Sequence, residues 1–399
     1  MQRLTTELRS GVARCALWCV VALVPSLIAT AGWSQSLTWL GVLPRHTESR
    51  AFGVSADGSV VVGASIEHAR SEDDPREPRL RITPFLWTRQ TGIQQLDVGT
   101  YENHAEAVGV SADGSVVVGH ALDGQWRAFR WTRSGVQNLV AGFVYDISAN
   151  GSVVVGQAVD GRAFRWTRAG VEYIGDNISC AYGVSADGLV VVGGAIINGS
   201  SRSFRWTRAR GLEYLNIPAG WSEAWNVSAD GSVVVGYAFD GSRYYSFRWT
   251  DAEGAQTLGY FWAPGMSADG SVVVGHDAYN RTAVRWTNST GIQDLNTVYA
   301  NLLSPGSYLF VAYSISPDGR YIVGSGYNAD TRREEAFLLD TGFPLPGDVD
   351  RNGCVSDTDL LRVLFEFGGR GYRNEDLNWD GVVDDLDLLV VLFNFGRGC

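Results

Sequence analysis

The chain of 399 residues contains no lysine, and all 32 of its basic residues are arginines. This absence excludes a lysine Schiff base, a lysine-bearing phosphate loop and a Ser–Lys catalytic pair. Charged residues are also few, at 19%, and the net charge of −11 disfavours nucleic-acid binding. Glycine is abundant instead, with 48 residues, and aromatic residues reach 12%. This composition favours many short strands joined by tight turns over a coiled coil or a disordered chain.

Long apolar runs are also scarce, and the longest stands near the start. Three arginines precede the apolar run Cys15–Ala29, and small residues follow at positions 29–31. These are the parts of a secretory signal peptide, predicted over residues 1–31. The alternative is an uncleaved anchor, but a spanning helix needs about 20 apolar residues. We therefore expect a protein secreted to the outside or the cell surface of a bacterium, with no membrane association after cleavage.

A repeated segment similar to V-S-A-D-G-S-V-V-V-G divides most of the chain. Its Asp-Gly or Asn-Gly pair marks seven copies, here called repeats 1 to 7. Their corner glycines are Gly58, Gly114, Gly151, Gly188, Gly231, Gly270 and Gly319. A strand ending in Trp-Thr follows in each of the first six repeats, and a short G-I-Q-x-L-like run comes after it. Each repeat therefore predicts four short strands, with a hairpin turn at the corner glycine.

Four strands in about 40 residues, repeated seven times, predict a mainly β fold, a seven-bladed β-propeller over residues 37–340. Repeat 7 ends at Ala336–Asp340 and lacks a fourth strand. A separate strand pattern, Leu37–Leu43, precedes repeat 1. We expect this strand to pair beside Ala336–Asp340 and close the ring. An insertion rich in both charges, Glu67–Arg81, is expected to form a solvated loop.

The repeats resemble the HAF repeats of bacterial extracellular proteins, which share the core V-S-x-D-G-x-V-V-V-G and a Trp-Thr strand. The resemblance covers about residues 51–340 and implies little about activity. Residues that recur in every repeat suit a structural role better than catalysis. The corner Asp residues are interpreted as turn formers and the Trp-Thr tryptophans as buried between blades. The arginine before such a tryptophan in repeats 2 to 6 is expected to pair with a corner Asp or a backbone carbonyl, the alternative being a ring that binds an anionic polymer.

Non-repeated aromatic residues gather on the connections expected at one face. The candidate ligand residues are Trp221, Trp225, Tyr244, Tyr245, Tyr260 and Trp262. Aromatic rings with few charges suit stacking on sugars, although such rings also cap blade ends. Glu223 is the one candidate acid for catalysis, and no partner carboxylate is evident. The five histidines show no H-E-x-x-H or H-x-x-x-H spacing, which disfavours a catalytic zinc site.

Composition changes after residue 340, where residues 341–346 form a stiff linker. Residues 347–399 contain two Asp-rich segments in phase, each followed by an apolar helical run. Both place oxygen side chains at positions 1, 3, 5, 9 and 12, with glycine at 6, the pattern of an EF-hand calcium loop. Two Ca²⁺ ions are expected, the position-7 residues offering only their carbonyl. The ligands are Asp348, Asp350, Asn352, Cys354, Ser356 and Asp359, then Asp376, Asn378, Asp380, Val382, Asp384 and Asp387.

This segment resembles a dockerin type I module, which implies docking to a cohesin domain on a scaffold or cell surface. The helical runs Val363–Phe365 and Val391–Phe393 are unusually apolar, which puts a standard cohesin in doubt and leaves another surface protein as the alternative. The internal pseudo-twofold of the two loops predicts a Cys354–Cys399 disulfide. The alternatives are free thiols or pairing with Cys180.

These observations favour a secreted binding or assembly protein, a propeller scaffold with a calcium-dependent docking module. A polysaccharide is a candidate ligand, in the context of polysaccharide breakdown. The alternative is an extracellular glycan-active enzyme, a glycoside hydrolase or lyase, with a docking tag.

Overall fold

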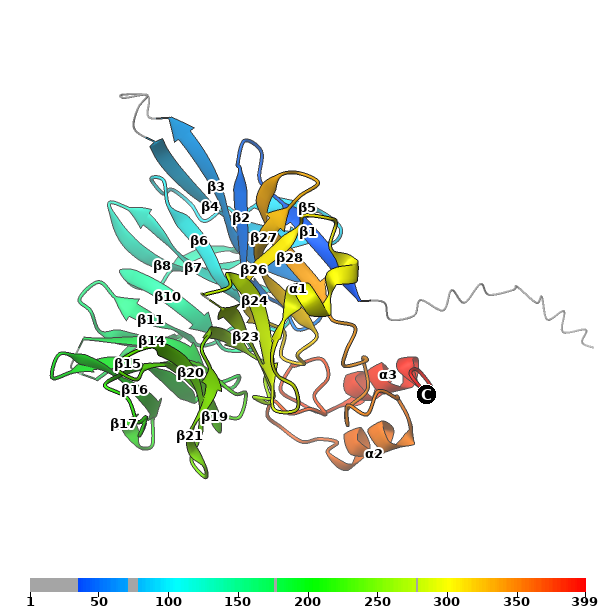
Figure 1. Cartoon of the computed structure of the whole chain (residues 1–399). Helices are drawn as coiled ribbons and strands as arrows, with labels where there is room; N and C mark the ends of the chain where they lie inside the picture. Colours follow the sequence, from blue (N-terminus) through cyan, green and yellow to red (C-terminus); the bar gives the residue numbers. More distant parts are fainter. Residues whose placement is uncertain (1–34, 71–77, 176–177, 278) are drawn as a thin grey trace, which may run out of the picture. The chain divides into compact units, whose positions relative to one another are not determined.

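The computed structural model describes residues 35–70, 78–175, 178–277 and 279–399 (Figure 1). The predicted signal peptide, residues 1–31, lies outside the described residues. Among the residues that the structure describes, no helix is long and apolar enough to cross a bilayer.

Repeats 2 to 6 each form a separate four-stranded antiparallel sheet, with the strands in sequence order. Repeat 2 forms β6 (Ala105–Val110), β7 (Val116–Asp123), β8 (Gln125–Thr132) and β9 (Gly135–Asn138). Repeat 3 forms β10 (Gly142–Ile147), β11 (Val154–Ala158), β12 (Ala163–Thr167) and β13 (Gly170–Ile174). Repeat 4 forms β14 (Ser179–Val184), β15 (Val190–Ile197), β16 (Ser200–Thr207) and β17 (Gly211–Tyr214). Repeat 5 forms β18 (Trp221–Val227), β19 (Val233–Phe239), β20 (Tyr244–Thr250) and β21 (Gly254–Gly259). Repeat 6 forms β22 (Trp262–Met266), β23 (Val272–Asp277), β24 (Thr282–Thr287) and β25 (Gly291–Asp294).

Repeats 1 and 7 together form an eight-stranded sheet. Repeat 1 supplies β2 (Glu48–Val54), β3 (Val60–Arg70), β4 (Pro78–Thr88) and β5 (Gly92–Gln95). Repeat 7 supplies β26 (Tyr308–Ile315), β27 (Tyr321–Asn328) and β28 (Arg333–Asp340). The eighth strand is β1 (Ser36–Gly41). A parallel pairing at Glu48 and Glu334 joins two groups that each have four strands.

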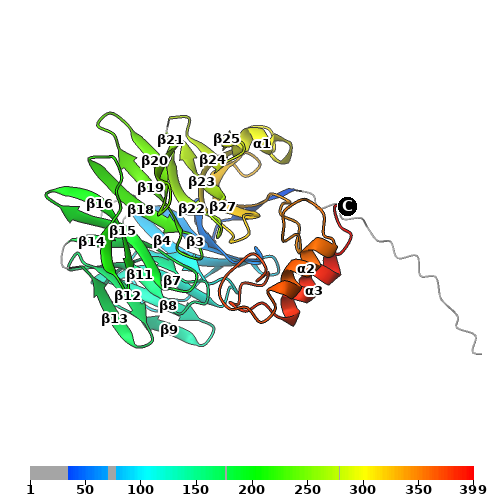
Figure 2. The ribbon, with the colours of Figure 1, turned by 90° about the horizontal axis from the view of Figure 1, so that it is seen from below.

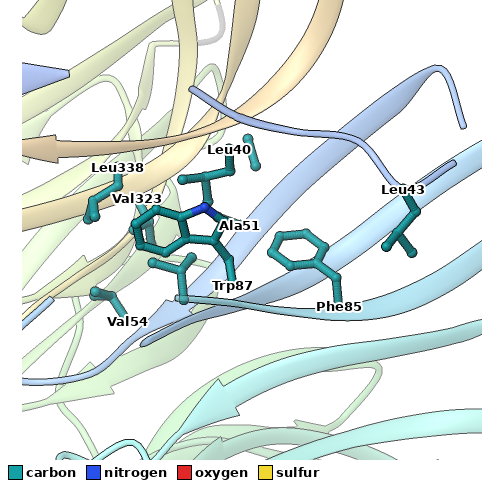
Figure 3. Close-up of a cluster of buried hydrophobic side chains, with 10 residues drawn as sticks. Leu40, Leu43, Ala51, Val54, Phe85, Trp87, Val323 and Leu338 are labelled. Carbon is teal, nitrogen blue, oxygen red and sulfur yellow. The ribbon is translucent and has the colours of Figure 1, made fainter. Parts of the chain in front are cut away.

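The N-terminal strand completes repeat 7, as predicted. β1 pairs antiparallel with β28, Leu37 lying opposite Leu339 and Gly41 opposite Ala336. Beyond β1 the chain turns into repeat 1, where Leu43 N donates to Ser65 Oγ at 3.2 Å. Figure 3 shows the core that results, in which residues of β1, repeat 1 and repeat 7 meet: Leu40, Leu43, Ala51, Val54, Phe85, Trp87, Val323 and Leu338. Segments far apart in the sequence therefore share one apolar cluster.

Backbone hydrogen bonds at the corners connect successive repeats. Ala56 N donates to Ala112 O at 2.9 Å, and the equivalent bond recurs through the later repeats up to Ala268 N and Pro317 O, 2.8 Å apart. The corner of repeat 7 carries Pro317, which has no N–H group to donate. Repeat 7 cannot donate this bond to repeat 1. The two repeats are joined instead by β1, which pairs with β28, and by the parallel pairing at Glu48 and Glu334.

The repeated residues account for the core. The phenylalanine of the third strand is fully buried in six repeats, at Phe85, Phe129, Phe164, Phe204, Phe247 and Phe337. In these six repeats the glycine at the end of the second-strand valine run lies under this ring. A Cβ on Gly119 would overlap the Phe129 ring and the backbone carbonyl of Glu106. Glycine is therefore required there by the close approach of the ring and the neighbouring strand.

The insertion in repeat 1 differs from the expected loop. β3 and β4 extend into it and pair from Glu67 and Arg81 to Arg70 and Pro78. Only its centre, residues 71–77, lies outside the described residues. The loop was expected because the segment is highly charged. Charged residues can also lie on a hairpin whose two strands stay paired beyond the rest of the sheet.

After β25 come a short helix, α1 (Leu295–Val298), and a 3₁₀ turn at Ala300–Leu302. The C-terminal segment contains α2 (Asp357–Phe365) and α3 (Asp385–Asn394). These two helices lie side by side (Figure 2) and share a small core of Val349, Val355, Val363, Val383 and Val391.

Candidate functional site

The first strand of each repeat carries a register irregularity at the same place. In β14, for example, Ala181 and Gly183 lie opposite consecutive residues of β15, so Tyr182 is the extra residue of a β-bulge. Bulges re-aim a side chain. The residues six positions before the corner glycines are Phe52, Val108, Tyr145, Tyr182, Trp225, Pro264 and Tyr313.

All seven of these residues line one cavity of about 240 Å³. Since they come from the first strands of all seven repeats, the cavity lies where those strands converge. The bulges therefore turn a repeated backbone feature into a lining whose side chains differ from repeat to repeat.

Aromatic rings form a nearly continuous lining, here called the aromatic belt: Phe52, Tyr145, Tyr182, Trp225, Trp262 and Tyr313. Tyr182 stacks on Trp225 with ring centroids 4.4 Å apart. Trp225 meets Trp262 edge to face at 5.5 Å, and Trp262 meets Tyr313 at 6.1 Å. Each ring is therefore oriented by its neighbours in adjacent repeats.

The phenols of the belt stay neutral. Burial raises the pKa of Tyr145 to about 12, with smaller contributions from Cys180 and Glu223. Burial likewise raises the pKa of Tyr182, and the nearby Cys180 and Glu223 raise it further. The cavity thus offers aromatic faces and neutral hydroxyl groups rather than phenolate charge.

Two carboxylates, Asp146 and Glu106, line the cavity, and Asp146 lies beside the bulge of β10. Asp146 accepts hydrogen bonds from Ile147 N at 2.8 Å and Val184 N at 2.9 Å, the latter from the next repeat. Burial raises its pKa to about 7, and the two backbone bonds oppose this shift. Asn226 stands at the same place in repeat 5, where its Oδ1 accepts from Val227 N and its Nδ2 donates to Pro264 O. Both side chains tie one repeat to the next.

The structure separates the six candidate ligand residues into four environments. Trp225 and Trp262 belong to the aromatic belt. Trp221 and Tyr244 belong to a second cluster on repeat 5, here called the outer aromatic patch, with Tyr237 and Phe239. Tyr244 is 49% exposed and stacks on Tyr237 at 4.9 Å, while Trp221 stands perpendicular to Tyr244 at 5.7 Å.

The last two candidates differ from each other. Tyr245 is buried among Ile217, Ala238 and Phe247 and serves the core, because alternate residues of β20 point to opposite faces. Its role as a ligand residue was therefore wrongly expected. Tyr260 is 47% exposed, and the Arg243 guanidinium lies 5.4 Å from its ring centroid.

Glu223 lies between the belt and the outer aromatic patch. Burial raises its pKa, and hydrogen bonds from Ser201 Oγ at 3.3 Å and from Tyr182 oppose that rise. Among the described residues, Glu223 belongs to neither group of clustered metal-ligating side chains. Its raised pKa favours the protonated carboxyl group, but its polar contacts are hydroxyl groups rather than a second carboxylate.

The corner residues and the Trp-Thr tryptophans have the structural roles expected of them, and the arginines do so only in part. Ser55 Oγ and Ser59 N both donate to Asp57 Oδ1, at 2.7 and 2.9 Å, and the same turn recurs at every corner. Arg165 donates twice to Gly188 O, the corner glycine of the next repeat. Arg248 pairs with Glu253, and Arg285 binds Gln293 and Tyr299, rather than a corner Asp or a backbone carbonyl. Trp87, Trp166 and Trp206 are buried, and Trp131, Trp249 and Trp286 partly so.

Two groups of potential site residues escaped the sequence analysis. The belt includes Phe52, Tyr145, Tyr182 and Tyr313, which an alignment of the repeats on the corner glycine would have revealed at one shared position. A cluster of His104, Glu106 and His120 was missed because its members meet across two strands of repeat 2, so no motif spacing marks it.

The first C-terminal loop brings its acidic residues together. Oxygens of Asp348, Asp350 and Asp359 lie within 4.8 Å of one another. Asp359 is fully buried, and its Oδ1 accepts from Val349 N at 2.8 Å. Within the described residues, none of the ion pairs involves these carboxylates. Several buried like charges without a basic partner fit a bound cation.

The second loop repeats this arrangement. Asp376 and Asp387 are fully buried, and Leu377 N donates to Asp387 Oδ1 at 2.7 Å as Val349 N does to Asp359. Burial raises the pKa of Asp376 to about 7, and the nearby carboxylates Asp387 and Asp380 add to this. Ser356 and Asp384, the expected position-9 ligands, also cap α2 and α3 through capping boxes.

A disulfide joins Cys354 and Cys399, as predicted. Cys180 is a free thiol whose pKa is raised mainly by burial. Val363 and Val391 point into the shared core. Other apolar residues of the two helices are exposed, among them the matching pairs Leu364 with Leu392 and Phe365 with Phe393, the two phenylalanines at 84% and 78%.

No family model and no curated protein matches the chain. Solved structures do resemble it. Virginiamycin B lyase from Staphylococcus aureus is 14% identical with a TM-score of 0.51, the match covering 77% of this chain and 99% of that one. Oligogalacturonate lyase from Vibrio parahaemolyticus is 11% identical with a TM-score of 0.50, covering 76% of this chain and 93% of that one. These neighbours are β-propeller proteins, so the likeness supports a propeller fold and carries no function with it.

Proposed function

We propose that this chain is an exported glycan-binding propeller with a calcium-dependent docking module. We count seven blades, taking the eight-stranded sheet as two blades joined at Glu48 and Glu334, in keeping with the seven HAF-like repeats. The signal-like residues 1–31 support export, and the bonds between successive corners support a rigid scaffold. Binding rather than catalysis is proposed because the polar partners of Glu223 are not carboxylates.

The outer aromatic patch, in which Tyr244 is exposed and its neighbours are partly buried, is the observation that carries the glycan proposal. Tyr237 and Tyr244 stack at 4.9 Å, and Trp221 stands at a right angle beside them. An aromatic face presented to solvent suits the C–H faces of sugar rings, and rings fixed by their neighbours lose little entropy on binding. The patch and the half-exposed Tyr260 occupy neighbouring repeats, which suits a chain-like ligand.

Affinity electrophoresis of the full chain in gels containing plant or microbial polysaccharides tests this proposal. The chain should be retarded by one class of glycan, and Tyr244→Ala should lose at least about tenfold in affinity. Tyr214→Ala is the matched control, because Tyr214 is equally exposed, at 48%, on the outer strand of another repeat. Absence of retardation on every glycan, or equal retardation of both variants, would argue against glycan binding.

We propose Ca²⁺ for both C-terminal loops, because the available ligands are oxygens and calcium prefers several of them at flexible distances. The ligands are those predicted from the sequence, with the carbonyls of Cys354 and Val382 at position 7. The bound ions would neutralise the buried carboxylates and hold each loop against the helix that follows it.

The exposed, duplicated face of α2 and α3 is proposed as the docking surface for a protein partner with an apolar face, cohesin-like or otherwise. The full chain should capture one partner from the native secretome with calcium and none with a chelator. Phe365→Ser with Phe393→Ser should abolish capture. Ile178→Ser, which removes an apolar residue that is 62% exposed from a propeller repeat, should not. Capture that ignores both calcium and the helix variants would refute docking.

The second candidate function, a glycan-active enzyme, has one observation in its favour. Glu223 combines a raised pKa with a place between two aromatic clusters. If it acts as a general acid, reducing-sugar or unsaturated-uronate assays should detect product with the wild-type chain and none with Glu223→Gln. Binding of the same glycan without product supports the binding protein.

A further inference from the structure

Repeat 2 differs from the other repeats at the rim of its first two strands. In each repeat the residue eight positions before the corner glycine lies opposite the residue six positions after it. Repeat 2 alone has an acid facing a histidine there, Glu106 with His120. The residue two before Glu106 is His104, and its side chain comes to the same place. The other repeats have the same β-bulge with other combinations of residues at these positions, so the fold does not depend on these three side chains.

The geometry of this cluster is that of metal ligands. His104 Nε2 lies 3.3 Å from Glu106 Oε1, and His120 Nε2 lies 3.6 Å from Glu106 Oε2. The three ligand atoms are all within 4.8 Å of one another. Bonds of about 2.0–2.2 Å from a tetrahedral ion to nitrogen and oxygen place two ligands roughly 3.3–3.6 Å apart. The spacing therefore matches a shared ion.

The surroundings hold both imidazoles in place. Trp126 on β8 meets the His104 ring at 4.8 Å and the His120 ring at 5.4 Å, both edge to face. Phe143 from the next repeat contacts His120 at 5.2 Å. The backbone at His104 is fixed as well, since Leu122 N donates to His104 O at 2.8 Å. Donors already oriented in this way lose little freedom when they bind an ion.

The arginine at the equivalent position of repeat 1 has its own partner. Arg50, at the same position in repeat 1 as Glu106 in repeat 2, pairs with Glu48 at 3.5 Å. Glu106 is therefore left to interact with the two histidines. Its side chain also lines the central cavity of the aromatic belt, so one side of the cluster is open to a small molecule there.

We propose that His104, Glu106 and His120 bind a divalent transition-metal ion of the zinc class, with an open coordination position toward the central cavity. Two imidazoles and one carboxylate select such an ion over Ca²⁺, which prefers oxygen ligands alone. Three protein ligands leave room for water or for an oxygen of a ligand in the cavity. The site is independent of the glycan and docking proposals, because none of its ligands belongs to the outer aromatic patch or to the C-terminal loops.

Co²⁺ titration of the full chain in excess Ca²⁺ tests the proposal, since Ca²⁺ keeps the oxygen-only loops filled. One equivalent of Co²⁺ should give the visible absorption bands of a four- or five-coordinate site with nitrogen ligands, and Zn²⁺ should abolish them by displacement. Glu106→Gln and His104→Asn should each weaken binding by more than about 100-fold, because even outer-shell changes cost 10–100-fold.

The matched control is His276→Gln. His276 occupies in repeat 6 the position of His120, but it lies opposite Trp262 and contacts Phe310 O at 3.0 Å. This variant should bind Co²⁺ as the wild type does. His104 and Glu106 are partly exposed, so their variants should retain the wild-type melting temperature and remain informative. Absence of the bands in the folded wild type, or equal binding by Glu106→Gln, would overturn the proposal.

Discussion

The rings of Tyr182 and Trp225, from β14 and β18, are stacked with their centroids 4.4 Å and their planes 9° apart. Both residues occupy the bulge position of their repeats, so the contact follows from two copies of one backbone feature. The same position carries Val108 in repeat 2 and Pro264 in repeat 6. The repeat thus fixes where a side chain goes, and the residue placed there decides what the cavity offers.

A double-mutant cycle should detect this stack. Tyr182→Leu and Trp225→Leu should show a coupling energy of about 0.5–1.5 kcal/mol, the usual value for an aromatic pair beyond its buried area. Urea unfolding of the two single variants and the double variant measures it. The control pair is Tyr182 with Tyr313, which contacts Phe52 and Trp262 instead. An equally large coupling energy for the control pair would mean that the cycle measures overall destabilisation of the aromatic belt rather than the Tyr182–Trp225 stack.

Asp146 should make stability depend on pH. Its pKa is raised from 3.8 to about 7, so the folded state retains a proton that the unfolded state has released. The free energy of unfolding should therefore be highest below about pH 4 and fall as pH rises through 7. The fall is on the order of 2–4 kcal/mol for this partly exposed group, because a difference of one in pKa corresponds to about 1.36 kcal/mol. Asp146→Asn, the side chain used at Asn226, should flatten the profile and stabilise the protein at about pH 8.

Urea unfolding of both proteins between about pH 4 and 8 measures this difference. The control is Asp160→Asn, an exposed carboxylate whose pKa is lowered mainly by Arg162 and which should leave the slope in that window unchanged. An Asp146→Asn profile parallel to that of the wild type would contradict the assignment.

The buried serine of each corner should contribute more to the free energy of unfolding than an exposed serine of the same corner. Val233 N donates to the buried Ser228 Oγ at 2.9 Å, and Ser228 Oγ donates to Asp230 Oδ1 at 2.6 Å. Ser228→Ala leaves a buried N–H without its acceptor and should cost about 1–3 kcal/mol in the free energy of unfolding. Ser232→Ala removes only an exposed bond to the same carboxylate and should cost less than about 0.5 kcal/mol. If thermal or urea unfolding shows the same loss of stability for Ser228→Ala and Ser232→Ala, burial of the Ser228 hydrogen bond does not matter to stability.

The repeat pattern was sufficient to predict the strands, the pairing of the N-terminal strand and the disulfide, because each depends on local periodicity or on internal symmetry. The site was predicted less well. Tyr245 was misassigned because it was expected on a connection, whereas β20 begins at Tyr244 and places Tyr245 on the same face as Phe247. His104, Glu106 and His120 were missed for a different reason: cross-strand register, rather than spacing along the chain, brings them together. Burial of Asp146 likewise depends on contacts from the next repeat.

The final prediction concerns the linked effects of calcium and the Cys354–Cys399 disulfide on the C-terminal segment. Its shared core consists of five buried valines and a few partly buried leucines, so it is too small to be stable without other support. The disulfide spans a sequence separation of 45, which the chain-entropy model converts to about 4 kcal/mol. Bound calcium removes the repulsion among the buried carboxylates of each loop. Either support alone should hold the fold, and loss of both should unfold it.

Chelation should therefore lower the melting temperature of this segment sharply in the Cys354→Ser, Cys399→Ser variant and much less in the oxidised wild type. Circular dichroism at a helical wavelength follows it, because α2 and α3 contain most of the helix among the described residues. Cys180→Ser is the matched control, since it removes the free thiol and leaves the disulfide intact. Alkylation of the secreted protein should label Cys180 only after denaturation, because burial raises the pKa of its thiol. Recovery of Cys399 as a free thiol would refute the bridge, and equal sensitivity of the wild type and the double variant to chelation would refute the linkage.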